Sequence, residues 1–301
     1  MRALRQLLLL LVIPALLGGC GVGSPAASGG RLRVVAAENF WGSIATQLGG
    51  DRVQVTSIVT SPGSDPHEYE PTARDARAFA SAEVAIVNGI GYDPWASKLI
   101  SANPVDGRRV ITVGDVVGIQ AGGNPHRWYS PSNVDQAIDA ITAAYKQLDP
   151  GHASYFSARR NRFETEGLAQ YHDLIASIRR RYAGVPVGAS ESVVEPLAAS
   201  LGLRLLTPLG FMNAISEGAE PTAADKSTVD RQIAQRQIRV WIYNSQNATP
   251  DVKRLTDEAR ANGLQVVGVT ETLTPASASF EDWQSRELGD LAQALEAATG
   301  R

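Results

Sequence analysis

A strand pattern and the loop behind it decide the fold: Val53-Gln54-Val55-Thr56-Ser57-Ile58-Val59 and Asp65-Pro66-His67-Glu68-Tyr69-Glu70-Pro71. His67 comes after the predicted strand, at its carboxyl end. Open α/β sheets bind their ligands at this end of their strands. Pro66 and Pro71 stiffen the loop, because each fixes its own φ and restricts the residue before it. Taken alone, the loop is equally compatible with a surface histidine in a turn.

A second loop repeats the same pattern: Gly122-Gly123-Asn124-Pro125-His126-Arg127-Trp128. The chain has 4 histidines, and two of them, His67 and His126, lie in Pro-His loops with an aromatic residue two positions later. Neutral imidazole is the commonest metal-binding side chain. The two loops together therefore predict half of a metal site.

Composition restricts the classes of function. The 301 residues suffice for two lobes, each with its own core. A net charge of −3 gives no basic surface, and we therefore expect no nucleic-acid partner. The single cysteine, Cys20, excludes intrachain disulfides, cysteine-based zinc sites and iron–sulfur clusters.

The first thirty residues indicate export. A basic start precedes an apolar run from Leu7 to Leu17 that is too short to span a bilayer in the usual way. The segment Leu17-Gly18-Gly19-Cys20 resembles the bacterial lipoprotein box, which implies cleavage before Cys20 and lipid on its sulfur. The alternative is an ordinary secretory signal with a chance cysteine. We assign residues 1–20 to the signal peptide and 21–30, rich in glycine, serine and alanine, to a flexible tether.

Alternating strand and helix patterns predict an α/β fold with mainly parallel sheets. An N-terminal lobe is expected over residues 31–150 and a C-terminal lobe over 184–301, without a motif-level repeat between them. Residues 153–182 contain no proline and a single glycine, Gly167, which predicts one long rigid helix joining the lobes within residues 151–183. The alternative is two helices broken at Gly167.

Six motifs in this order resemble the metal-binding lipoproteins of bacterial ABC importers for zinc and manganese, the cluster A-I solute-binding proteins. They are residues 62–71, Asn88-Gly89, Asp93-Pro94-Trp95, residues 124–128, Ser190-Glu191 and Glu220-Pro221. The resemblance covers nearly all of the mature chain. It implies two α/β lobes joined by one rigid helix, with the metal site in the cleft between the lobes.

The resemblance also implies a ligand set. His67 and His126 match the two histidine ligands of the N-terminal lobe, and Glu191 matches the third position, which holds His in many zinc-type members and Glu in manganese-type members. A hard carboxylate favours manganese, although intrinsic affinity favours Zn²⁺ over Mn²⁺. Glu191 is also compatible with an acid that merely stabilises the N-terminus of a helix.

The fourth ligand position departs from the family pattern. The family has an Asp shortly before the last helix, and counting back from the apolar residues of that helix places it near Ala278, which is not acidic. The acids nearby are Glu271, Glu281 and Asp282. We take Asp282 as the fourth ligand, although it could equally cap the final helix, and a three-ligand site completed by water stays open. His152 and His172 lack the Pro-His context and are not expected to bind metal.

The function implied by the resemblance is a lipid-anchored, extracytoplasmic receptor. It would bind Zn²⁺ or Mn²⁺ as a transported ligand, deliver it to an ABC permease, act as a monomer and catalyse nothing. The alternative is a secreted zinc-dependent hydrolase with a two-His-one-Glu site and Glu68 or Glu70 as general base. The chain lacks a His-Glu-x-x-His helix, which disfavours that alternative. A siderophore or haem binder is a third possibility, disfavoured by the two Pro-His loops.

Overall fold

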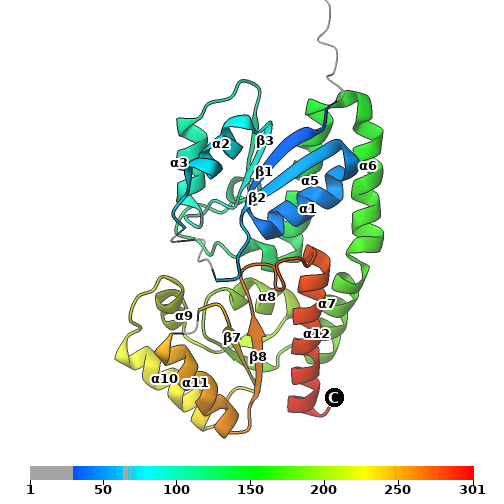
Figure 1. The fold of residues 1–301 in the computed structure, drawn as a ribbon. Coiled ribbons are helices and arrows are strands. Elements are labelled where there is room, and N and C mark those ends of the chain that lie inside the picture. The colour runs from blue at the N-terminus through cyan, green and yellow to red at the C-terminus, as the bar shows by residue number, and fades with distance from the viewer. Residues whose placement is uncertain (1–29, 64–66, 68, 248) are drawn as a thin grey trace, which may run out of the picture.

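The computed structural model describes residues 30–301 apart from 64–66, 68 and 248. The chain forms two α/β lobes, drawn one above the other in Figure 1, as the sequence predicts. The signal peptide, Cys20 and nearly all of the tether expected at the N-terminus lie outside the described residues. Within the described residues, no helix is both long and apolar enough to cross a membrane.

The N-terminal lobe is built on a four-stranded sheet in which every pairing is parallel and the order is β2-β1-β3-β4. Its strands are β1 (Leu32–Glu38), β2 (Val53–Val59), β3 (Val84–Val87) and β4 (Arg109–Thr112). The central strand β3 is buried along its whole length, which explains its continuous run of apolar residues. The helices and short helical turns of this lobe are α1 (Asn39–Gly49), Gly50–Arg52, α2 (Ala73–Ser81), α3 (Pro94–Ala102), α4 (Val113–Val116), Arg127–Tyr129 and α5 (Pro131–Leu148).

The C-terminal lobe repeats this topology with a second parallel sheet of order β6-β5-β7-β8. Its strands are β5 (Pro186–Ala189), β6 (Arg204–Leu205), β7 (Val240–Asn244) and β8 (Gln265–Val269). Its helices are α8 (Val194–Leu201), α9 (Leu209–Ser216), α10 (Ala223–Ala234), α11 (Pro250–Ala261) and α12 (Phe280–Thr299). Both sheets therefore place the second strand at one edge and the first beside it, a similarity of topology that no repeated motif in the sequence reveals.

The connection between the lobes is helical but not one regular helix. After a short turn at Pro150–His152, α6 (Ala153–Arg162) leads into a π-helical turn, Phe163–Gly167, and α7 (Ala169–Tyr182) follows along the same side of the molecule (Figure 1). A Cβ on Gly167 would lie 2.8 Å from Cδ2 of Phe163, so the turn packs too tightly for a side chain there. The prediction of a single unbroken helix is wrong at this point, because the wider turn interrupts the α-helical pattern next to Gly167.

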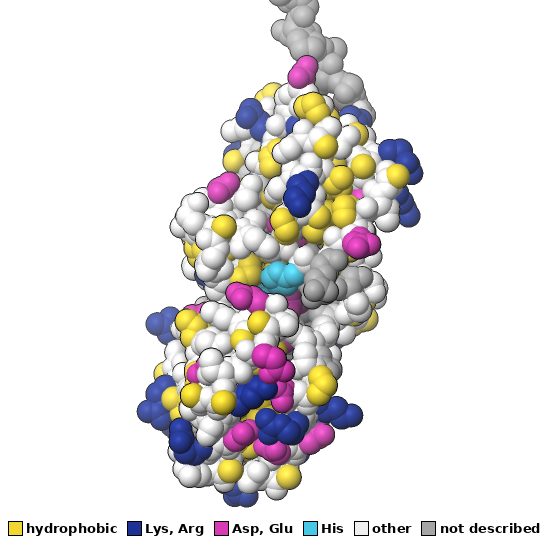
Figure 2. Space-filling view, turned by 90° about the vertical axis from the view of Figure 1, so that its left-hand side faces the viewer, with side chains coloured by type: hydrophobic (Ala, Val, Ile, Leu, Met, Phe, Trp, Pro, Cys, Tyr) yellow, Lys and Arg dark blue, Asp and Glu magenta, His cyan; other side chains and the backbone are white. Residues whose placement is uncertain are grey.

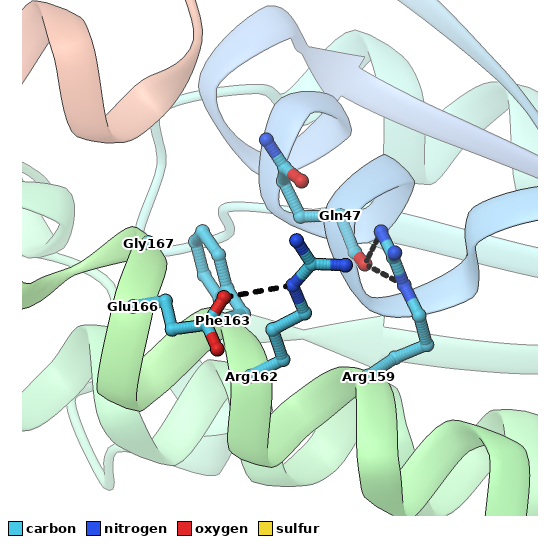
Figure 3. A pocket seen from close by; sticks show the side chains of 6 residues that line it. All are labelled: Gln47, Arg159, Arg162, Phe163, Glu166 and Gly167. Carbon is cyan, nitrogen blue, oxygen red and sulfur yellow. Dashed lines mark hydrogen bonds and ion pairs between the residues drawn. The ribbon is translucent and has the colours of Figure 1, made fainter.

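The π-helical turn lies beside α1, and a cavity of about 370 Å³ separates them (Figure 3). Arg159 crosses toward α1 and donates from Nε and one terminal nitrogen to the carbonyl oxygen of Gln47, at 2.9 and 2.6 Å. Arg162 pairs with Glu166 within the turn region at 2.9 Å. Both arginines therefore already have partners on the walls of this cavity.

One hydrophobic cluster runs through both lobes, where a separate core in each was expected. A second cluster, which includes Val35, Phe79 and Trp95, belongs to the N-terminal lobe alone. Phe40 at the start of α1 stacks on Trp128 with ring centroids 4.2 Å apart and lies 6.4 Å from Trp283 of α12. Tyr129 and Trp283 meet edge to face at 5.9 Å. Since these aromatic side chains are fully buried, the lobes are fused along this side rather than merely tethered.

Polar contacts from α1 reinforce that fused side at one position per helical turn. Asn39 Oδ1 accepts from the backbone N–H of Leu273 at 3.2 Å, and Ser43 Oγ accepts from that of Phe280 at 2.9 Å. One turn further on, Gln47 Nε2 donates to Glu281 Oε1 at 2.7 Å. The residues at i, i+4 and i+8 share one face of a helix, so α1 fixes residues 273–281 of the C-terminal lobe against the N-terminal lobe.

Candidate metal centre

The structure brings His67, His126 and Glu271 together between the two lobes. One potential ligand atom from each of the three side chains lies within 4.8 Å of the other two. His67 follows β2 in the N-terminal lobe, and Glu271 follows β8 in the C-terminal lobe. The site therefore forms where the carboxyl ends of strands from two parallel sheets meet, the usual position of ligand sites in open α/β sheets.

His126 is held most firmly. Its side chain is 1% exposed, and it precedes the short helical turn Arg127–Tyr129. The amide oxygen Oδ1 of Asn124 lies 2.8 Å from its Nδ1 and also accepts from its backbone N–H at 3.0 Å. Since an amide oxygen only accepts, Nδ1 carries a proton, and Nε2 is the ring nitrogen left to bind a metal. Nε2 lies 3.7 Å from Oε2 of Glu271, on the side where a metal would bind.

Hydrogen bonds from the N-terminal lobe hold the loop that carries His126. Asn88, which follows β3, donates from Nδ2 to the carbonyl oxygen of Pro125 at 2.9 Å. Trp41 of α1 donates from Nε1 to Oδ1 of Asn88 at 3.1 Å, so the orientation of this amide is also set. Bound-metal geometry depends on such outer contacts, because they orient the ligands before the metal arrives.

His67 is partly buried and packs against an aromatic wall. Its ring meets the ring of Tyr92 edge to face at 4.6 Å and lies 6.4 Å from the ring of His126, measured between centroids. Tyr92 itself is fully buried and also contacts His126 at 5.9 Å. Tyr92 thus supports both histidines from one side.

Glu271 receives hydrogen bonds from both lobes. Its Oε2 accepts from the hydroxyl of Tyr92 at 2.8 Å, and its Oε1 accepts from Nδ2 of Asn244 at 2.7 Å. Its backbone N–H donates to Gln246 Oε1 at 2.7 Å. Burial by itself would raise the pKa of Glu271, but the hydrogen bond and charge of His126, the charge of His67 and the hydrogen bond from Tyr92 outweigh it and lower that pKa. The carboxylate is therefore ionised and ready to bind a cation.

Glu191 lies beside this group without being one of its three members. It follows β5, as the sequence predicts, and its side chain is 1% exposed. Nδ2 of Asn244 donates to its Oε2 at 3.2 Å as well as to Glu271, so one amide group joins the two carboxylates. The structure thus places Glu191 next to the site, while its role as a ligand stays a prediction.

Asp282 is not brought to the site. It is exposed in the first turn of α12, where its backbone N–H donates to the hydroxyl of Ser279 at 3.2 Å. Ser279 is the residue that caps the helix, so Asp282 is not the cap either. The reason for the difference is the loop between β8 and α12, which includes Glu271 at its start and makes spacing from the helix a poor guide to the ligand position.

Glu271 is the member of this group that the sequence reasoning did not select, although it was among the three acids considered. The signal that could have found it is its position just after a strand near the end of the chain, β8, the same rule that pointed to His67. The two other histidines stay outside the group: Nδ1 of His152 lies 2.8 Å from Oδ2 of Asp149, and His172 lies in α7.

A cavity of about 470 Å³ opens beside the two histidines and is bounded by both lobes. Its walls include Gly91, Asn124 and His126 from the N-terminal lobe and Ser192 and Glu195 from the C-terminal lobe. The space-filling view shows a histidine side chain at the junction of the lobes with acidic side chains next to it (Figure 2). An ion can therefore reach the site from the interlobe cleft.

Comparison with known proteins gives the family. A model of the family described as zinc-uptake complex component A, periplasmic, matches residues 34–294. The chain belongs to this family. The resemblance to this family predicted two α/β lobes with parallel sheets, and the two sheets described above confirm that prediction.

Named relatives of this family include two lipoproteins. The metal ABC transporter substrate-binding lipoprotein FimA of Streptococcus parasanguinis is 34% identical over 251 residues, which cover 75% of this chain and 76% of FimA. The manganese-binding lipoprotein MntA of Halalkalibacterium halodurans is 29% identical over 177 residues, 56% of this chain and 59% of MntA. The chain thus spans less than two thirds of the length of MntA.

Solved structures support the fold. The manganese-bound periplasmic metal-binding protein from Candidatus Liberibacter asiaticus superimposes with a TM-score of 0.72 at 22% identity, covering 88% of this chain and 100% of that one. The periplasmic zinc-binding protein TroA from Treponema pallidum gives a TM-score of 0.73 at 20% identity, covering 88% of this chain and 99% of TroA. At these identities the similarity concerns the fold, and the site of this chain is argued from its own residues.

Proposed function

We propose that this chain is an extracytoplasmic receptor that binds one divalent transition metal, zinc or manganese, and delivers it to the permease of an ABC importer. The observation that carries the proposal is the convergence of His67, His126 and Glu271 within 4.8 Å from two different lobes. The names of FimA and MntA, a metal transporter lipoprotein and a manganese-binding lipoprotein, support it.

The donor set suits such a metal. Two neutral imidazoles and a carboxylate bind zinc, and carboxylates extend the range toward manganese. We propose Glu191 as a further carboxylate ligand, because the Asn244 amide holds it beside Glu271 in a buried place. Neighbouring like charges disfavour each other's ionisation unless a cation lies between them. A divalent ion would neutralise both carboxylates.

Membrane attachment is part of the proposal. Cys20 would carry the lipid, and residues 21–30 would let the two lobes reach a permease in the same membrane. The name lipoprotein in both relatives supports this attachment. We expect the receptor to act as a monomer, with the permease and the metal ion as its partners.

The hydrolase alternative finds no support among these relatives, which are named as binding proteins. Of the two acids that could have served as its general base, Glu70 is exposed and Glu68 lies outside the described residues. A binding protein holds its metal without turnover, so an assay for ester and peptide hydrolysis by the metal-loaded protein separates the two functions.

The test is the metal content of protein purified without added metal, followed by competition between Zn²⁺ and Mn²⁺. Wild-type protein should bind one equivalent, whereas His67→Gln and His126→Gln should each lose most of their affinity. His172→Gln is the matched control, because His172 lies in α7 and belongs to no ligand group in the described chain. If both site variants bind metal as the control does, the metal site lies elsewhere.

A further inference from the structure

Two buried carboxyl groups form a pair in the N-terminal lobe. Glu38 is the last residue of β1, and Asp93 comes one residue after Tyr92. They are 0% and 1% exposed, and a hydrogen bond joins their side chains. Among the described residues, Asp93 is the one whose charge acts on Glu38, so no cation compensates the pair there. Two neighbouring buried carboxyl groups cannot both ionise without a large cost, and the pair therefore keeps one proton.

The other hydrogen bonds of the pair show which acid holds that proton. Both oxygens of Asp93 accept from backbone N–H groups at 2.7 Å, Oδ1 from Gly89 and Oδ2 from Asn88. The carboxyl oxygens of Glu38 accept no hydrogen bond from another described residue. Glu38 is the N-cap residue of α1, but its side chain makes no capping bond to the helix. Because N–H donors stabilise an ionised acid, Asp93 is the anion and Glu38 is the neutral acid that donates to it.

The electrostatic surroundings of the two acids agree with this assignment. Burial raises the pKa of Glu38, and the charge of Asp93 and the hydrogen bond between the two acids raise it further. The backbone N–H of Glu38 itself opposes this rise least of all these effects. Burial also raises the pKa of Asp93, but the N–H groups of Gly89 and Asn88 and the bond from Glu38 oppose that rise. The proton therefore stays with Glu38.

Asp93 closes a turn that does not hold its shape by itself. The turn begins at Asn88, and residues 89–91 within it have positive φ values of 74°, 61° and 88°. The middle one is Ile90, and a left-handed conformation is strained for a β-branched residue. Such strain persists only where the surrounding contacts maintain it. The two hydrogen bonds that Asp93 accepts at the start of the turn are contacts of this kind.

Both ends of this turn support the metal ligands. At its start, Nδ2 of Asn88 donates to the carbonyl oxygen of Pro125, the residue before His126. At its end, Tyr92 packs against both histidines of the site and donates to Oε2 of Glu271. A group that holds the turn therefore also holds the contacts that orient the ligands.

We propose that Glu38 is a positioning residue for the metal site, a neutral acid that donates to Asp93 and thereby holds the turn that carries Asn88 and Tyr92. This inference rests on the proposed function and adds a residue that is not a member of the ligand group. A side chain at position 38 that donates to Asp93 preserves the turn. A side chain that cannot donate leaves Asp93 without one of its partners and loosens the turn, although it touches neither imidazole nor carboxylate of the ligand group.

The first measurement is the protonation state of Glu38 in metal-free protein, read from the ¹³C chemical shift of its side-chain carboxyl carbon. Glutamate labelled at this carbon provides the signal, and its absence in Glu38→Gln provides the assignment. At about pH 7, wild-type protein should show the shift of a protonated carboxyl group for Glu38, although an ordinary exposed glutamate is ionised at this pH. The shift of an ionised carboxylate would overturn the proposal.

The second measurement is metal affinity, which separates the hydrogen bond from the filling of space. Glu38→Met keeps a side chain of similar length but cannot donate, so binding should weaken by about 10–100-fold, the usual effect of losing an outer contact. Glu38→Gln should recover the wild-type affinity, because its NH₂ group donates to Asp93 as the protonated acid does. Ile44→Ala is the control: it removes buried apolar atoms from α1, so it should lower stability and leave affinity unchanged.

The variants of Glu38 decide the proposal together. Wild-type affinity in Glu38→Met, or a loss in Glu38→Gln as large as in Glu38→Met, would overturn it. Exchange of the Asn88 backbone N–H, which bonds to Asp93, should be faster in metal-free Glu38→Met than in metal-free Glu38→Gln. Because the carboxyl shift and this exchange are read without metal, their failure differs from failure of the proposed function, which the His67 and His126 variants test.

Discussion

The hydroxyl of Tyr92 in the N-terminal lobe donates to Oε2 of Glu271 in the C-terminal lobe at 2.8 Å. The ring of the same tyrosine packs edge to face against His67 and His126. One side chain therefore touches all three members of the ligand group. Its hydroxyl also bridges the lobes at the site itself, so the position of Glu271 depends on a residue that need not bind the metal.

Removing that hydroxyl should weaken metal binding without unfolding the protein. In Tyr92→Phe the ring still supports both histidines, but Oε2 of Glu271 loses its donor and becomes free to turn. We expect an affinity about 10–100-fold lower, measured by competition with a metal-binding dye. Tyr182→Phe is the control, because its hydroxyl bonds to the carbonyl oxygen of Arg301 instead. Equal affinities in the two variants would show that Tyr92 does not orient Glu271.

Glu271, Glu191 and Asp282, the acids considered as ligands, should differ in their effects on metal binding. Glu271→Gln should cost more than the roughly 10–100-fold typical of an outer contact, because it removes charge from a residue within the ligand group. Glu191→Gln should also weaken binding and reduce thermal stabilisation by the metal, since a ligand that binds only the folded state stabilises it by mass action. Asp282→Asn should bind as wild type, because Asp282 is exposed. Loss of binding in Asp282→Asn alone would reverse this assignment.

The sequence predicts the fold and half of the site because both follow from short-range patterns. The strand-end rule points to His67 and would also have pointed to Glu271. The Pro-His loop locates His126, and Glu191 comes from the family resemblance. The choice of Asp282 as the fourth ligand failed because the number of residues was counted backward from α12 across the loop between β8 and α12. At the start of α1, Asn39 accepts from the backbone of Leu273, and Phe40 packs against Trp128 and Trp283. No local pattern of the sequence records such long-range packing.

Two further features depend on packing that the sequence does not show. The π-helical turn at Phe163–Gly167 comes within a pattern that reads as continuous helix, and only the fit of Phe163 over Gly167 reveals it. The shared core arises because Phe40, Trp128 and Trp283 come from three distant segments. Periodicity assigns each of these residues to a buried face but does not say which lobe it faces.

Closure of the cleft on metal binding should be small. The contacts between α1 and residues 273–281, the shared core and the helical connection all resist a wide hinge motion. Spin labels on exposed positions of the two lobes should show nearly the same distance distribution with and without metal. A change in the mean distance on the scale of a domain closure would contradict the fused interface. Labels on the α10 and α11 helices, both within the C-terminal lobe, provide the control for label motion.

Membrane attachment should depend on Cys20, which lies outside the described residues. Cys20→Ala removes the sulfur that would carry the lipid, so the protein should leave the membrane fraction or accumulate unprocessed. Fractionation and metabolic labelling with a fatty acid would measure both effects. Gly21→Ala is a matched control that leaves the cysteine in place. Membrane association and labelling that persist in Cys20→Ala would mean that another segment anchors the chain.

Stability should also depend on Glu287, a buried acid of α12 that accepts hydrogen bonds from Thr270, the residue before Glu271. Burial raises its pKa from 4.5 to about 7, although hydrogen bonds from Tyr129, Thr270 and Trp283 oppose the rise. The folded protein therefore holds this proton at pH values where the unfolded chain has released it. The contribution to stability is complete below about pH 4.5, falls as pH rises, and is lost above about pH 7, a change on the order of 3 kcal/mol.

Glu287→Gln tests this dependence directly. A glutamine imitates the protonated acid, because its NH₂ group can donate to the hydroxyl oxygen of Tyr129 while its oxygen accepts from the N–H of Thr270 and the indole of Trp283. Urea unfolding of metal-free protein between pH 4.5 and 8 should show wild-type stability decreasing through this window and Glu287→Gln stability decreasing less. Asp290→Asn, an exposed change in the same helix, should follow wild type. Parallel curves for wild type and Glu287→Gln would mean that Glu287 is ionised in the folded protein throughout this range.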